Sequence, residues 1–292
     1  PAAAPAQQLA PIQYTVSMPA PETHLAHVKA RIPTGGRPFI DLMMAVWSPG
    51  YYVQENYATH VQDIAAAGAS GRALTIEPPQ PNRWRVTTAG DSYIVLSYTL
   101  VCDHHSVTGN SVDTTMAILN GPATYITLAE HLKRRHEVAL ELPARWKQSA
   151  TSLAAAPDSL LNHYEASSYD ELADSPIIAG NISFHDFAVA DAHYYLADIG
   201  EVPPQWDGAL AAQNLKKIVT ADYRFWGFIP FRKYVFLNVF RRGAGGLEHL
   251  NSTLLTSSPK STGGGDIRWL QYVSHEYFHA FNVKRLRPVQ LG

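Results

Sequence analysis

The sequence predicts a β-rich antiparallel domain followed by an α+β region, and two observations lead to this. From about Ile12 to Leu142, apolar and polar residues alternate with period two in short runs rich in β-branched and aromatic residues, broken by Pro, Gly and Asn. Beyond a segment near 166–176, short strand-like runs alternate with apolar residues at helical spacing. A chain of 292 residues exceeds the usual size of one domain. We therefore expect a flexible N-terminus at 1–10, the β domain at 11–168 and the α+β region at 169–292.

In the β domain, the alternating runs predict individual strands, and one alanine-rich stretch, VQDIAAAG at 61–68, has the composition of a short helix. The predicted strands lie at 12–18, 24–32, 42–49, 82–88, 93–101 and 137–143.

In the α+β region, we expect two strands within 181–200, a helix within 203–227 and a strand at 232–242. A glycine-containing turn or edge strand at 243–252 and a glycine-rich loop at 258–266 follow. Asp266 is well placed to cap a final helix that carries Ile267, Leu270 and Val273 at helical spacing.

Composition excludes several classes of protein. The formal charge of −2 and the lack of a long Lys/Arg block argue against a nucleic-acid binder, since KRLR at 284–287 is the only dense basic stretch. No run of eighteen apolar residues is present, so no membrane span is predicted. Cys102 is the only cysteine, which excludes an intrachain disulfide. The opening PAAAPAQQLAP is typical of a mature end after signal-peptide removal, which predicts a periplasmic or secreted protein.

The strongest motif is HEYFH, from His275 to His279, inside the predicted final helix. Two His four residues apart lie on one face of a helix, where both imidazoles can bind one zinc ion. Glu276, next to the first His, is placed to act as general base toward the attacking water. The alternative is a helical His pair that is only structural or lies at the surface, but the periodic apolar helix around it favours the metal site.

A second feature, GAGGLEHLNS, precedes this helix. Gly245 and Gly246 leave room for another backbone to approach, and an edge strand here would hold an extended peptide by main-chain hydrogen bonds. Glu248 at its end would pair with a free peptide amine. The alternative is that the glycines form a turn and that Glu248 is a solvated charge.

HEYFHAFNVKRLRP, GGLEHLNS and YDELADSP, together with the β-rich half, resemble the glycyl aminopeptidase family, gluzincin metallopeptidases related in fold to aminopeptidase N. The resemblance implies a β-rich N-terminal antiparallel domain followed by the first part of an α+β thermolysin-like (gluzincin) catalytic domain. It assigns His275 and His279 as zinc ligands, Glu276 as catalytic base and Glu248 as amine anchor. His249 replaces an Asn of the related G-x-M-E-N pattern.

In the same family the third zinc ligand is a Glu, and this Glu, a catalytic tyrosine and a PDZ domain are expected beyond residue 292. A companion C-terminal polypeptide of the same protein is therefore an expected partner. The leading hypothesis is a zinc aminopeptidase that removes a small N-terminal residue, Gly or Ala, from peptides. A non-catalytic peptide-binding or assembly module and a gluzincin endopeptidase remain as alternatives.

Other residues are interpreted as structural. Adjacent residues of CDHH, 102–105, point in opposite directions on a strand, which disfavours a shared metal. His131 and His136 are expected to be solvated, and Phe278 and Phe281 to lack covering helices. For the aromatics of 47–57 we favour the core over a cleft lining.

Overall fold

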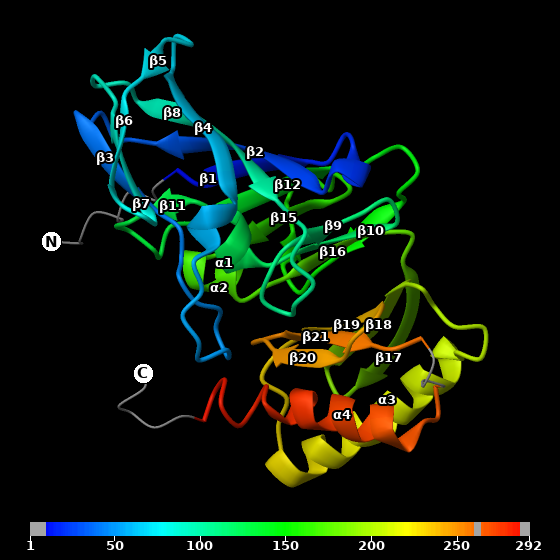
Figure 1. Ribbon diagram of the computed structural model, residues 1–292. Coiled ribbons are helices and arrows are strands. Elements are labelled where there is room, and N and C mark those ends of the chain that lie inside the picture. Colours follow the sequence, from blue (N-terminus) through cyan, green and yellow to red (C-terminus); the bar gives the residue numbers. More distant parts are fainter. Residues whose placement is uncertain (1–9, 260–263, 287–292) are drawn as a thin grey trace, which may run out of the picture.

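The computed structural model describes residues 10–259 and 264–286. Figure 1 shows an N-terminal half built from β-sheets and, below it, a C-terminal half in which two helices cover one face of a further sheet. Apart from Ala10, the predicted flexible N-terminus lies outside the described residues. In the described part of the chain, no helix has the length and apolar character that a bilayer crossing requires.

The N-terminal half contains three sheets. The largest has eight strands in the order β14-β15-β12-β1-β2-β8-β4-β5. These strands are β1 (Ile12–Ser17), β2 (Leu25–Pro33), β4 (Val61–Gly68), β5 (Ala73–Leu74), β8 (Tyr93–Val101), β12 (His136–Glu141), β14 (Ala154–Ala155) and β15 (His163–Ala166). Its pairs are antiparallel except for β1 and β12, which run parallel.

Two four-stranded sheets complete this half, in the orders β11-β3-β7-β6 and β13-β16-β10-β9. Their strands are β3 (Phe39–Met43), β6 (Ile76–Gln80), β7 (Arg83–Thr87), β9 (Ser111–Val112), β10 (Met116–Leu119), β11 (Thr127–Leu128), β13 (Gln148–Ala150) and β16 (Ile177–Gly180). Short helices link them: η1 (Pro21–Thr23), η2 (Tyr57–His60), α1 (Gly121–Thr124) and α2 (Tyr169–Ala173).

The segment 61–68 is a strand, so the helix predicted there is wrong. Its residues pair with β8, and the register shifts between Gln62 and Ala65. Alanine favours a helix locally, but the long neighbouring strand β8 offers backbone partners on both sides of this irregularity, at 61–62 and 65–68.

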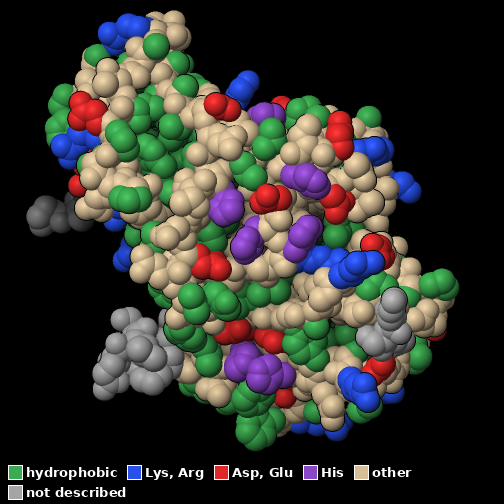
Figure 2. Space-filling view, viewed as in Figure 1, with side chains coloured by type: hydrophobic (Ala, Val, Ile, Leu, Met, Phe, Trp, Pro, Cys, Tyr) green, Lys and Arg blue, Asp and Glu red, His purple; other side chains and the backbone are tan. Residues whose placement is uncertain are grey.

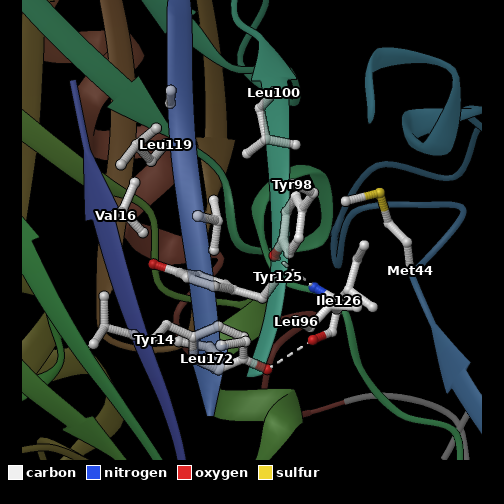
Figure 3. Close-up of a cluster of buried hydrophobic side chains, with 14 of the residues drawn as sticks. Tyr14, Val16, Met44, Leu96, Tyr98, Leu100, Leu119, Tyr125, Ile126 and Leu172 are labelled. Atoms are coloured by element: carbon white, nitrogen blue, oxygen red, sulfur yellow. Dashed lines mark hydrogen bonds between the residues drawn. The ribbon is translucent and has the colours of Figure 1, made fainter. Parts of the chain in front are cut away.

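Buried tyrosines link the sheet to the loops of the N-terminal core (Figure 3). The Tyr14 hydroxyl donates to the carbonyl of Ile126 at 3.0 Å, and the Tyr98 hydroxyl donates to the carbonyl of Thr124 at 2.8 Å. Because the hydroxyls of Tyr14 and Tyr98 are both satisfied, burial of these two side chains leaves no unpaired polar group.

The C-terminal half has a five-stranded sheet in the order β17-β18-β19-β21-β20. Its strands are β17 (Ser183–Val189), β18 (Ala192–Gly200), β19 (Lys233–Phe240), β20 (Gly245–Glu248) and β21 (Ser252–Ser257). The helices are α3 (Gly208–Trp226) and α4 (Ile267–Phe278). β20 runs antiparallel to β21 at the edge of the sheet, so of the turn and the edge strand expected at 243–252, the edge strand is present.

Both faces of this sheet are buried. One face packs on α3 and α4 through a core that includes Phe236, Val219 and Val273. The other packs on the sheet of β10 and β16 through residues such as Leu237 and Ile118. This second core joins the two halves, which fixes the N-terminal half beside the candidate site.

The predicted exposure of Phe281 is wrong. Phe281 is 1% exposed and its ring stacks on Trp226 with centroids 5.3 Å apart. Phe225 and Phe228, whose rings lie beside Phe278 and Phe281, are instead open, at 73% and 52% exposed.

Candidate active site

Helix α4 positions the HEYFH residues. Asp266 is its N-cap, and its carboxylate accepts a hydrogen bond from the backbone N–H of Arg268 at 2.8 Å, which confirms the predicted cap. The apolar side of the helix buries Trp269, Val273 and Tyr277 against the sheet. This packing fixes the rotation of the helix about its own axis, and it therefore also decides which way the other faces of the helix point.

The two histidines of the motif converge. The Nε2 atoms of His275 and His279 lie 3.1 Å apart. His279 Nδ1 lies 3.0 Å from the carbonyl oxygen of Asn282; since a carbonyl only accepts, Nδ1 carries the proton and Nε2 keeps its lone pair. Figure 2 shows histidine and acidic side chains together on the C-terminal half, just below the seam between the halves.

This donor pair fits one zinc ion. Two imidazole nitrogens on a tetrahedral zinc, each at the usual bond length, would be about 3.3–3.4 Å apart. The observed separation is close to that value, and the nitrogen lone pair on His279 is free to bind a metal. Among residues 10–259 and 264–286, no third His, Cys, Asp or Glu joins the pair to form a complete ligand set.

Glu276 is buried although it is a carboxylate. It is 6% exposed, and burial raises its pKa to about 7, with the charge of Glu248 adding to the rise and His279 opposing it. A carboxyl group whose pKa is close to neutral pH can both accept and return a proton, which is the property required of a general base.

The edge strand β20 lies directly against α4. A Cβ on Gly246 would be 2.3 Å from the Tyr272 hydroxyl and 2.5 Å from Oε1 of Glu276. Gly245 is less confined, because its nearest neighbour would be Val107 Cγ1 at 3.2 Å. Only glycine at 246 therefore allows the strand to approach the Glu276 carboxylate this closely.

Glu248 ends this strand and is 8% exposed, so it is not a solvated charge. The same strand lies against Glu276 at Gly246, and the charge of Glu248 contributes to the raised pKa of Glu276. On its other side lies the N-terminal half: a Cβ on Gly50 would be 2.8 Å from Oε1 of Glu248.

The turn after Glu248 is held by a buried polar cluster. His249, 2% exposed, donates from Nδ1 to Asp174 at 2.9 Å. The same carboxylate accepts from Lys284 Nζ at 3.0 Å and from the backbone N–H of Leu250 at 2.9 Å. Burial acts to raise the pKa of Asp174, but the hydrogen bond and charge of His249, with Lys284, hold it below its ordinary value.

Sequence reasoning missed several of these residues. Tyr272 precedes Glu276 by one helical turn, and this spacing was a usable signal. Gly50 and Asp174 reach the site from distant parts of the chain, and the residues next to them in sequence do not indicate a role at this site. The contact of His249, which replaces an Asn of the related pattern, also becomes clear only in the fold.

The other histidines and aromatic residues considered in the sequence differ in their surroundings and in their burial. Among the described residues, His104 and His105 belong to no cluster of three or more possible metal ligands. His136 is 1% exposed in the N-terminal core, so its predicted solvation is wrong. Of the aromatic residues at 47–57, Tyr57 is buried, whereas Trp47, Tyr51 and Tyr52 are 50%, 37% and 73% exposed. The core position favoured for them is therefore correct for Tyr57 alone.

The mixed sheet with its edge strand and covering helices resembles the fold of M1 (gluzincin) aminopeptidases. Residues 13–181 match the Peptidase M61 N-terminal domain, and residues 268–292 match M61 glycyl aminopeptidase. The chain belongs to the M61 glycyl aminopeptidase family. No curated protein sequence matches it.

Solved structures share the fold. An aminopeptidase N family protein from Idiomarina loihiensis is 24% identical with a TM-score of 0.87, over 95% of this chain and 49% of that one. An M1 zinc metallopeptidase from Deinococcus radiodurans is 12% identical with a TM-score of 0.52, over 94% of this chain and 63% of that one. Leukotriene A4 hydrolase from Saccharomyces cerevisiae is 12% identical with a TM-score of 0.53, over 94% and 44%. The chain thus spans about half to two thirds of the length of these proteins.

Proposed function

We propose that this chain carries the central part of the active site of a zinc aminopeptidase that removes a small N-terminal residue, Gly or Ala, from peptides. One observation carries the proposal. Glu276, on the helix of the convergent His pair, lies against an edge strand that ends in the buried carboxylate of Glu248. A base beside a metal-ligand pair suits hydrolysis, and a second carboxylate at the strand end suits recognition of an amine.

His275 and His279 would hold the zinc through their Nε2 atoms. When bound, the ion supplies positive charge that polarises the attacking water and the scissile carbonyl and lowers the pKa of Glu276. Glu276 accepts the proton of the attacking water and returns it to the leaving amine. Its burial keeps bulk water from competing for that proton.

The peptide would lie along the open side of β20. An edge strand has unpaired backbone groups that bind an extended chain, and glycine at 246 lets this strand lie against Glu276. Glu248 then pairs with the free amine of the first residue. An anchor for the amine places the first peptide bond over the base, so that one residue is removed at a time.

Completion of the zinc site is part of this proposal. The described residues offer two histidines, whereas a catalytic zinc commonly takes three protein ligands. We propose that a Glu from the remainder of the catalytic domain is the third ligand. Packing of that remainder on the exposed Phe225 and Phe228 is consistent with their open positions beside α4.

The test is hydrolysis of glycyl-p-nitroanilide and its N-acetylated form by the full-length protein. We expect cleavage of the free-amine substrate only, loss of activity with a chelator and recovery with zinc. Cleavage of internal bonds in acetylated peptides would favour an endopeptidase. Binding of peptides without hydrolysis by the zinc-loaded protein would favour a non-catalytic module.

A further inference from the structure

A loop of the N-terminal half reaches the amine end of the proposed site. It connects β3 with η2, and in Figure 1 it descends from the upper half toward β20. Its tip contains a turn in which the N–H of Tyr51 donates to the carbonyl of Ser48 at 3.0 Å. Gly50 lies within this turn.

Hydrogen bonds involving Ser48, Glu55 and Tyr57 hold the loop in place. Ser48 Oγ and the Tyr57 hydroxyl lie 2.7 Å apart, and the Tyr57 hydroxyl also contacts Glu55. Thr108 donates to the other oxygen of Glu55 at 3.0 Å. Because Tyr57 is 5% exposed, this network anchors the loop to the core of the N-terminal half.

Gly50 makes the contact with the site. A Cβ there would lie 2.8 Å from Oε1, 3.0 Å from Cδ and 3.3 Å from the backbone oxygen of Glu248. The φ of Gly50 is +94°, which L-residues rarely adopt. The loop backbone therefore abuts both the carboxylate and the main chain of Glu248, and no side chain fits between them.

We propose that Gly50 is a positioning residue for amine recognition: its backbone confines the Glu248 carboxylate on the side away from α4 and keeps it aimed at the free amine of the substrate. This inference rests on the proposed function. The N-terminal half is then one wall of the amine subsite. A larger residue at position 50 displaces Glu248 and weakens binding of ligands that have a free amine.

The test compares two inhibitors of the full-length zinc enzyme. Glycine hydroxamate has an amine and a zinc-binding group, whereas acetohydroxamate has the zinc-binding group alone. Gly50→Ala should weaken inhibition by glycine hydroxamate about tenfold or more, the loss expected for a displaced charged hydrogen bond. Inhibition by acetohydroxamate and the zinc content should stay unchanged.

Gly71→Ala is the matched control. Gly71 has φ +82°, and no atom lies within 4 Å of the position that a Cβ would take there. Alanine at position 71 therefore introduces similar backbone strain without a new contact. This variant should leave inhibition by both compounds unaffected.

Glu248→Asp shortens the side chain by one methylene and so makes space for the methyl group that Gly50→Ala adds. In this background, Gly50→Ala should weaken inhibition by glycine hydroxamate less than about threefold.

Hydrogen exchange provides a second measurement in case Gly50→Ala does not fold. In the Glu276→Gln enzyme, a glycyl peptide should slow exchange at residues 48–53, and the acetylated peptide should not. Equal effects of Gly50→Ala on both inhibitors, an effect no larger than that of Gly71→Ala, or unchanged exchange in this loop would each overturn the inference. If Glu248→Ala itself leaves glycine hydroxamate binding intact, the proposed function fails instead.

Discussion

Asp174 accepts a hydrogen bond from His249 at 2.9 Å, although the two residues are 75 positions apart. Asp174 follows α2 in the N-terminal part of the chain, and His249 follows the proposed amine anchor. Through Lys284, the same carboxylate also binds the segment after the HEYFH helix. One buried side chain thus ties together the three segments that place Glu248 relative to α4.

Removal of the Asp174 carboxylate should lower the stability of the folded protein. Asp174→Asn leaves Lys284 buried without a counter-charge, and breaking a buried pair in this way costs about 3–5 kcal/mol. We expect a loss of this order in the free energy of unfolding by urea, together with a raised KM for glycyl substrates. Asp158→Asn is the control, because it breaks an exposed Asp–His contact and should change stability little.

The same cluster predicts an acid limit to stability. The pKa of Asp174 is lowered in the fold, so its contribution is fully present above the unfolded pKa of about 3.9 and is lost as pH falls through the lower folded pKa. The difference in stability between the parent and Asp174→Asn should therefore shrink below about pH 4. A difference that stays constant down to pH 2 would contradict this.

Glu276→Gln should lose turnover and keep zinc. The amide cannot accept a proton, whereas His275 and His279 remain intact, so kcat on a glycyl substrate should fall at least about 10²-fold. Zinc content, measured by mass spectrometry, should match the parent. Glu201→Gln, at an exposed position, serves as the control, and hydrolysis by Glu276→Gln at the parent rate would refute the assigned base.

Glu248→Ala should raise KM and lower kcat on free-amine peptides. The anchor both binds the amine and positions the scissile bond, so its loss affects both constants. Glu248→Gln should behave similarly, because it keeps the shape but removes the charge. Equal rates on free and acetylated peptides before and after the change would show that Glu248 has no role in amine recognition.

His136 predicts a second pH dependence, in the N-terminal half. Burial is the main cause that lowers its pKa to about 4, so the folded state holds it neutral while the unfolded chain binds a proton below about pH 6.5. Stability should fall by about 3 kcal/mol as pH drops from 6.5 to 4. His136→Gln should show a flatter profile in denaturant titrations at several pH values. The exposed His131→Gln should retain the slope of the parent.

Much of the site followed from local sequence. Asp266 capped the helix as its residue type and position predicted, and the spacing of His275 and His279 placed both on one face. The glycines before Glu248 indicated a turn or an edge strand, and β20 is an edge strand. Each of these features is decided by residues within one or two turns or one strand, so local patterns were sufficient.

The rest depended on contacts between distant segments. The alanines of 61–68 favour a helix, yet pairing with β8 made them a strand. His136 was expected in solvent because its strand position relative to the core was not visible locally. Gly50 and Asp174 contact the segment around Glu248 across the seam of the two halves, and neither has a neighbour in sequence that indicates it.

The zinc affinity provides the final prediction. The described residues offer two imidazoles, and an ion held by two ligands should exchange readily, whereas a third carboxylate completes the protein coordination expected of a catalytic centre. A longer polypeptide that supplies this carboxylate should therefore bind zinc at least about 100-fold more tightly than residues 1–292 alone, measured by competition with a chromophoric chelator. His279→Ala should abolish the remaining affinity of the shorter chain, and His131→Ala should not. Stoichiometric, tight zinc and peptidase activity in a stable monomer of residues 1–292 would contradict a shared site and would require a third ligand within this chain.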